Sequence, residues 1–217
     1  MTPAQQLDRR RIWTFLAWTY GICWAMVGAL YAAGIKWGTP PSMAVAMAYM
    51  LVPGGVVIAL ARRWGVPLRE YGLRWQMRPV ILLAPLLPVV LTVLSVVVAV
   101  AVGWGHYQSP GALVVQQLLN GLPPAQAEAL LNVLKKVPGA QVLVLAAVVV
   151  ASLVAGLTVN LLFALGEELG WRGLLQRELA PLGFARSSLL IGAIWGLWHA
   201  PIIIQGHNYP QHPLPGV

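Results

Sequence analysis

Residues 141–173 read QVLVLAAVVVASLVAGLTVNLLFALGEELGWRG, and this stretch decides how the rest of the chain is interpreted. No charged residue occurs from Gln141 to Leu165, and the run is long enough to cross about 30 Å of hydrocarbon as a helix. Glu167 and Glu168 then stand side by side, with Arg172 one helical turn beyond. Because an ionised carboxylate inside a bilayer costs roughly 2.5–3.5 kcal/mol on insertion scales, an adjacent pair of them indicates a function.

The composition of the whole chain is that of a membrane protein. Of its 217 residues, 59% are hydrophobic and 9% are charged, and the mean hydropathy is +0.73. A soluble domain has about a quarter of its residues charged. We therefore expect an all-α, polytopic transmembrane helix bundle, since in lipid every backbone polar group must be paired internally. No long stretch alternates with period two, which argues against a barrel. The single cysteine, Cys23, gives no disulfide and no metal-ligand spacing.

The sequence predicts one transmembrane domain over residues 1–217, with about five spans. Their approximate limits are 12–35, 42–61, 80–102, 141–180 and 185–204. Between the third and fourth spans, Ala125–Val137 has helical spacing between two proline-containing turns, and we expect a short interfacial helix there.

The net charge of +8 is concentrated at the ends of the apolar runs. Eleven arginines fall on one side of the predicted membrane and three lysines on the other, which predicts a cytoplasmic N-terminus. Basic residues do not interleave with aromatic ones as in single-strand binders, so we expect no nucleic acid as a partner.

A helical hairpin brings the glutamate pair level with a histidine. Residues 166–180 and 185–199 form its two legs, joined by Ala180-Pro181-Leu182-Gly183-Phe184. At about 1.5 Å per residue, Glu167 and His199 both lie roughly 20 Å from the turn. Antiparallel helices with a short loop pack side by side. Glu167 and His199 are therefore predicted to lie at one depth.

A carboxylate and an imidazole at one depth can activate water. A glutamate removed from water becomes a competent general base, and histidine can polarise a carbonyl, donate a proton or bind a metal. Arg172 can form an i, i+4 ion pair with Glu168, which leaves Glu167 as the base. Asn160, one heptad earlier, shares the face of Glu167. The alternative is a structural Glu168–Arg172 pair and a His199 that only makes a hydrogen bond within the bundle.

Glu167-Glu168-x-x-x-Arg172, followed by Trp195-x-x-x-His199, resembles the two motifs of a known protease family. This is the CAAX-protease and bacteriocin-processing family of intramembrane metalloproteases, which includes the type II CAAX prenyl endopeptidases. The family patterns are Glu-Glu-x-x-x-Arg and Phe-x-x-x-His, so Trp195 replaces phenylalanine. The resemblance is specific over residues 157–201.

This resemblance implies an intramembrane endopeptidase that hydrolyses a peptide bond near the cytoplasmic face. Glu167 would activate the water, and Glu168 and Arg172 would support the site. His199 would bind the water or a metal and stabilise the oxyanion. Metal-free and metal-dependent mechanisms both stay open; a divalent metal such as zinc would use Glu167 and His199 as ligands.

The resemblance also gives expectations for partners and location. We expect contact with membrane lipid, a peptide or prenylated protein as substrate, and an integral protein of a bacterial inner membrane. Family members carry a later helix with another histidine and a nearby asparagine. Here His207 and His212 lie in a proline-rich loop, so we expect the last helices of the fold to be missing from these residues.

Other classes of function remain as alternatives. A non-catalytic membrane scaffold or a bacteriocin self-immunity protein could retain the motif. A proton-relaying transporter would use the same charges but predicts inverted repeats, and none is visible. The substrate identity and the oligomeric state are left open.

Overall fold

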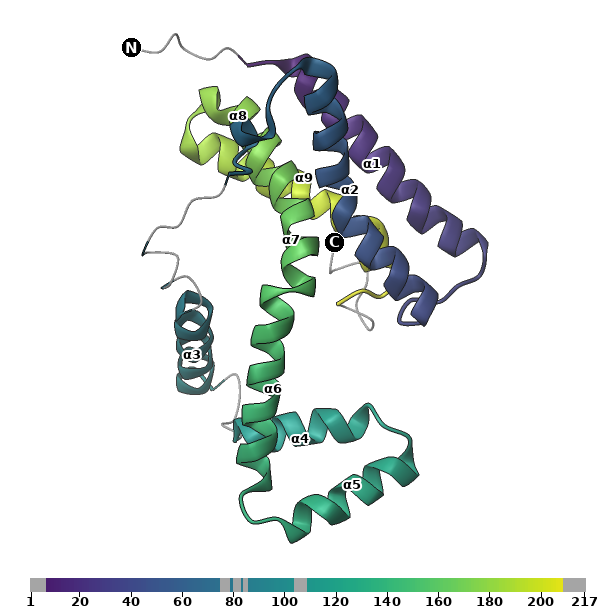
Figure 1. Cartoon of the computed structure of the whole chain (residues 1–217), viewed down its shortest axis with the longest axis vertical. Helices are drawn as coiled ribbons and strands as arrows, with labels where there is room; N and C mark the ends of the chain where they lie inside the picture. Colours follow the sequence, from purple (N-terminus) through teal and green to yellow (C-terminus); the bar gives the residue numbers. More distant parts are fainter. Residues whose placement is uncertain (1–6, 75–78, 80–82, 84–85, 104–108, 209–217) are drawn as a thin grey trace. The chain divides into compact units, whose positions relative to one another are not determined.

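The computed structural model describes residues 7–74, 79, 83, 86–103 and 109–208 (Figure 1). These residues form helices and turns without a strand, which confirms the all-α prediction. The chain divides into two compact units, one made of residues 1–74 and 159–217 and the other of residues 75–158. Each unit is described by itself.

Four of the described helices are long and apolar enough to cross a membrane. They are α1 (Arg9–Ala32), α2 (Pro40–Trp64), α6 (Ala140–Leu157) and α9 (Phe184–Ile204). The span predicted at 80–102 corresponds to α3 (Leu86–Ala101), which is apolar but has 16 residues; residues 80–82, 84 and 85 lie outside the described part. These helices support an integral membrane protein.

The segment 141–180 is a succession of shorter elements and not one continuous helix. α6 ends at Leu157, and Thr158 has φ −122° and ψ −93°, which is not a helical conformation. α7 (Val159–Glu168) follows, then a π-helical segment, η3 (Leu169–Leu175), and α8 (Gln176–Leu179). Threonine is no strong helix breaker, so the sequence carried no clear signal for this interruption.

The hairpin turn lies where the sequence predicted it. η4 (Ala180–Leu182) is a short 3₁₀ turn, Gly183 has φ 81°, and α9 begins at Phe184. A positive φ at this position suits glycine, which has no Cβ to clash. The two legs therefore run back alongside each other, with α8 against α9 and η3 against α9.

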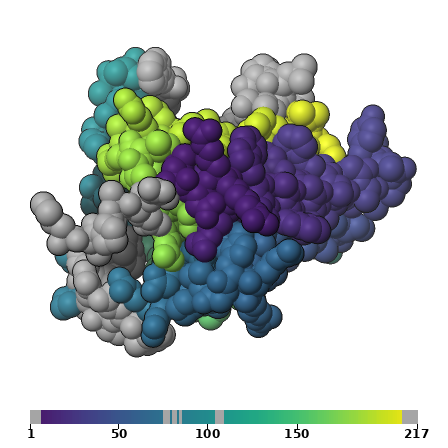
Figure 2. Space-filling view, turned by 90° about the horizontal axis from the view of Figure 1, so that it is seen from above, coloured from purple at the N-terminus to yellow at the C-terminus, as the bar shows by residue number. Residues whose placement is uncertain are grey.

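The unit that contains the hairpin is organised around α2, which packs against α1, α7 and η3. Its core is rich in fully buried aromatic side chains from α1, α2, η3 and α9, namely Phe15, Tyr49, Trp171 and Trp198. Figure 2 shows the start of α1 lying against the hairpin, where Arg11 Nη1 is 3.5 Å from Glu178 Oε1. η1 (Leu68–Tyr71) also packs against η3.

Three glycines allow the glutamate-bearing helix to lie directly on its neighbours. A Cβ added to Gly166 would lie 2.6 Å from the carbonyl oxygen of Met50, and one on Gly170 would lie 2.5 Å from Pro53 Cβ. A Cβ on Gly173 would lie 2.6 Å from the carbonyl oxygen of Tyr71. Small residues at such spacing permit close approach of helix backbones in membranes. The contacts therefore fix the position of the Glu167–Glu168 pair against α2.

The second unit contains α3, α4 (Pro110–Asn120), α5 (Pro124–Lys136) and α6. α4 packs against both α5 and α6, and Gly111 lies against the backbone of Gln141. α5 occupies the position of the short helix expected at residues 125–137, so the helix is present, and its place at the membrane interface stays a prediction.

Candidate active site

Glu167 lies in the last turn of α7, directly before the π-helical segment. Its side chain is 8% exposed although it carries a carboxylate. The indole Nε1–H of Trp195 donates a hydrogen bond to Glu167 Oε2 at 2.9 Å. This bond crosses the hairpin from α9 to α7. It gives the buried carboxylate the charge-assisted partner that such a group requires.

His199 lies one turn after Trp195 on α9 and is joined to it by a second hydrogen bond. His199 Nδ1 is 2.9 Å from the carbonyl oxygen of Trp195. A carbonyl oxygen only accepts, so this bond requires the proton on Nδ1 and leaves the lone pair on Nε2. Trp195 thus connects the two predicted catalytic groups, donating to Glu167 and accepting from His199. The hairpin brings Glu167 and His199 together through this residue.

Aromatic contacts hold the Trp195 ring in place. It is stacked on Trp171 with a centroid separation of 6.3 Å and an interplanar angle of 28°. The guanidinium carbon of Arg172 lies 5.0 Å from the centre of the Trp195 ring. Trp171 in turn makes edge contacts with Trp198 and Phe15. Because the indole packs against Trp171 and Arg172, its N–H has a defined direction toward Glu167.

The ion pair predicted between Glu168 and Arg172 is present, with Arg172 Nη1 donating to Glu168 Oε1. Both side chains are about half exposed, at 41% and 55%. The pair therefore occupies the accessible side of the helix, whereas Glu167 faces the interior. The two adjacent carboxylates have different environments, as the assignment of Glu167 as the base requires.

Two tyrosines, which the sequence interpretation did not single out, bind the backbone of α9 around the site. Tyr20 of α1 donates its hydroxyl to the carbonyl of Ile194, and Tyr49 of α2 donates to the carbonyl of Trp198. These carbonyls directly precede Trp195 and His199 in the chain. A tyrosine within an apolar span normally needs a hydrogen-bond partner for its hydroxyl. This was the signal in the sequence that could have identified Tyr20 and Tyr49.

Asn160, predicted to support Glu167, lies in the first turn of α7 and is exposed. Among the described residues no hydrogen bond joins it to Glu167. Residues 159–162 at the start of α7 are exposed, whereas Glu167 near its end is buried. A shared helix face was therefore not enough to place Asn160 in the site.

The described residues do not complete a metal site. A catalytic zinc ion takes three protein ligands, and no group of three His, Cys, Asp or Glu side chains suitable for a metal occurs in the described ranges. Glu167 and His199 would supply two. His207 packs on the ring of Trp37, with centroids 5.2 Å apart, and burial lowers its pKa. His212 lies outside the described residues. We therefore assign no step to a metal.

Comparison with known protein families gives a match that covers the hairpin. Residues 143–212 match the family model described as type II CAAX prenyl endopeptidase Rce1-like. This segment contains Glu167, Glu168, Arg172, Trp195 and His199, and the match confirms the family resemblance of the two motifs. No curated protein and no solved structure matches the chain.

Proposed function

We propose that this chain is an intramembrane endopeptidase in which Glu167 activates the water that attacks a peptide carbonyl. The family match supports a CAAX-protease-like function at the level of the family. The observation that carries the finer proposal is the pair of hydrogen bonds that join Glu167 and His199 to Trp195.

The proposed reaction begins with a water held between Glu167 and His199. Trp195 occupies Oε2 of Glu167, and no described residue donates to Oε1, so Oε1 is the atom proposed to take a proton from water. His199 Nε2, with its lone pair, would accept the second hydrogen. The water oxygen then has its lone pairs available for attack. In this tautomer His199 suits water binding more directly than oxyanion stabilisation.

The remaining steps return the proton to the leaving group. Water oxygen adds to the carbonyl carbon as Glu167 takes the proton, which gives a tetrahedral oxyanion. When the oxyanion collapses, the C–N bond breaks and Glu167 passes its proton to the departing nitrogen. The products are a carboxyl group and an amine, and Glu167 is again ionised.

Glu168 and Arg172 are proposed to support this site and not to act as the base. Their ion pair keeps the charge of Glu168 away from the reacting water, and Arg172 packs on the Trp195 ring. We further propose that the protein lies in a bacterial inner membrane with its N-terminus in the cytoplasm. The arginines, which lie mainly on one side of the spans, support this orientation. We propose a peptide or a prenylated protein as the substrate. Zinc stays a proposed cofactor, but no step of the reaction is assigned to it.

The test is cleavage of a reporter peptide by the full chain reconstituted in lipid. Glu167→Gln and His199→Ala should each lower the rate of cleavage by about 100-fold or more while the protein still inserts and folds. Glu128→Gln, an exposed glutamate of α5, is the matched control and should cleave normally. Retained cleavage in both site variants would overturn the proposal. A folded wild-type protein that cleaves no member of a broad peptide set would favour the scaffold or self-immunity alternative.

A further inference from the structure

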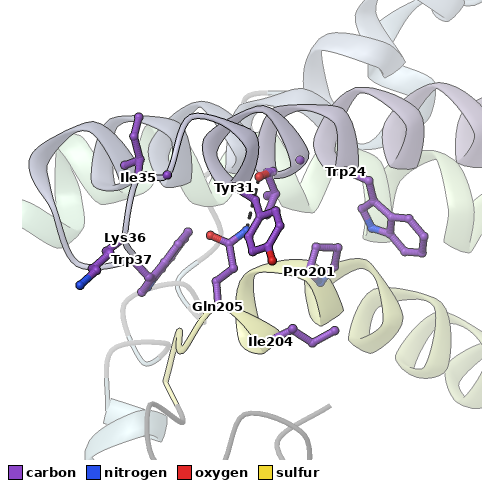
Figure 3. Close-up of a pocket in the computed structure, with 11 residues that line it drawn as sticks. Trp24, Tyr31, Ile35, Lys36, Trp37, Pro201, Ile204 and Gln205 are labelled. Carbon is purple, nitrogen blue, oxygen red and sulfur yellow. Dashed lines mark hydrogen bonds between the residues drawn. The ribbon is translucent and has the colours of Figure 1, made fainter.

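A cavity separate from the hydrogen-bonded pair lies between α1 and the end of α9 (Figure 3). It has a volume of about 780 Å³, within the range of roughly 300–1,000 Å³ typical of ligand pockets. Neither Glu167 nor His199 lines it. All of its lining residues belong to the compact unit that contains the hairpin.

The lining of this cavity changes from apolar to polar along its length. Figure 3 shows Trp24 at one end and Lys36 at the other, with Pro201 and Ile204 of α9 facing α1 between them. At about 1.5 Å per residue, α1 covers roughly 12 Å from Trp24 to its end at Ala32. The cavity is thus long enough for part of a hydrocarbon chain, with a cation at one end.

The helix ends indicate the depth of the cavity in a membrane. α1 and α9 are both candidate spans, and they end at Ala32 and Ile204, on the side where Lys36 lies. Ends of spans lie at the membrane–water interface, where tryptophan and tyrosine are enriched. Tyr31 and Trp37 line the cavity at this end. The apolar end then lies at the depth of lipid chains and Lys36 at the depth of headgroups.

We propose that this cavity binds one anionic phospholipid, with an acyl chain between α1 and α9 and the phosphate at Lys36. The exposed ammonium of Lys36 complements a net negative headgroup. A Cβ built on Gly28 meets nothing within 4 Å, so the middle of the groove has room for the chain. Gln205 donates to the carbonyl of Val27 at 3.3 Å and holds the two helices together there. This proposal does not rest on the proposed peptidase activity.

The test is lipid retention by the full chain in native mass spectrometry, with phosphatidylglycerol and phosphatidylcholine supplied in equal amounts. The wild type should retain one phosphatidylglycerol, preferred about fivefold, the effect expected of one lysine near an anionic headgroup. Lys36→Gln should remove the preference while lipid is still retained. Lys135→Gln, a change of charge in α5, should keep it.

A second pair of variants tests the groove itself. Gly28→Leu should fill the space and abolish retention, whereas Gly21→Leu, on the same helix and equally unobstructed but not lining the cavity, should not. Ile204→Trp fills the groove from α9 and serves if Gly28→Leu fails to fold. A wild type that retains no lipid, a groove-filling variant that retains as much as the wild type, or a Lys36→Gln variant that keeps the preference would each overturn the proposal.

Discussion

Replacing Trp195 with phenylalanine tests whether the indole N–H positions the proposed base. Phenylalanine keeps an aromatic ring over Trp171 but removes the donor that lies 2.9 Å from Glu167 Oε2. The bond to His199 uses the Trp195 backbone carbonyl and is unaffected by the side chain. The substitution therefore removes the hydrogen bond to Glu167 and keeps the hydrogen bond to His199. Phenylalanine is also the residue that the resembled motif has at this position.

The expected size of the effect follows from the bond that is lost. A hydrogen bond to a charged group contributes about 1.5–3 kcal/mol. If all of it holds Glu167 in its reacting position, kcat/KM falls by about 10- to 150-fold, since each 1.36 kcal/mol is tenfold. The loss should appear in kcat, with KM nearly constant, because Trp195 is not proposed to touch the substrate.

The assay is steady-state cleavage of a fluorogenic peptide by protein in lipid nanodiscs, with the melting temperature of each variant measured alongside. Trp18→Phe, at a position that is 59% exposed on α1, controls for loss of an indole as such. A Trp195→Phe enzyme with kcat/KM within twofold of the wild type would refute the positioning role. A lower melting temperature with unchanged kcat would show that Trp195 acts only in packing.

Three further predictions follow from the hairpin and its contacts. Glu167→Gln should lower kcat by about 10²- to 10⁴-fold, the usual contribution of a general base. Glu168→Gln should lower kcat by about fivefold or less, because its ion pair is half exposed. Equal losses of kcat in the peptide assay would contradict the assignment of Glu167 as the base. Gly170→Ala should destabilise the fold by about 1–3 kcal/mol, because the added Cβ clashes with Pro53. Gly192→Ala should not, because a Cβ at Gly192 meets no atom within 4 Å. Thermal unfolding of both variants in detergent makes the comparison. Tyr49→Phe should cost about 1 kcal/mol of unfolding free energy, measured by chemical denaturation, because the carbonyl of Trp198 loses its hydroxyl donor. Unchanged stability would show that this bond contributes nothing.

The features that depend on local pattern were predictable from the sequence. Hydropathy predicted α1, α2 and α9, because a span must be continuously apolar. The turn at Gly183 was predictable because proline and glycine limit the available conformations. The prediction that Glu167 and His199 lie at the same depth needed only the number of residues between each of them and that turn.

The features that depend on packing between helices were not predictable. Whether the Trp195 indole points toward Glu167 depends on Trp171 and Arg172, which pack on its ring. Asn160 was placed with Glu167 by helical phase, but Asn160 is exposed whereas Glu167 is buried. The contacts of Gly166 and Gly170 depend on which segment of α2 lies opposite, and no periodicity in one helix shows that.

The π-helical segment Leu169–Leu175 makes this region tolerant of one change in chain length. A π-helical turn accommodates one more residue than an α-helical turn between hydrogen-bonded groups. Loss of one residue here would therefore leave an α-helical turn in its place, and α7 and α8 would keep nearly the same relative orientation. Glu178 would still face Arg11, and α9 would begin in the same direction. Loss of one residue from α7 would instead rotate everything beyond it by about 100°, because each residue of an α-helix turns the chain by that angle.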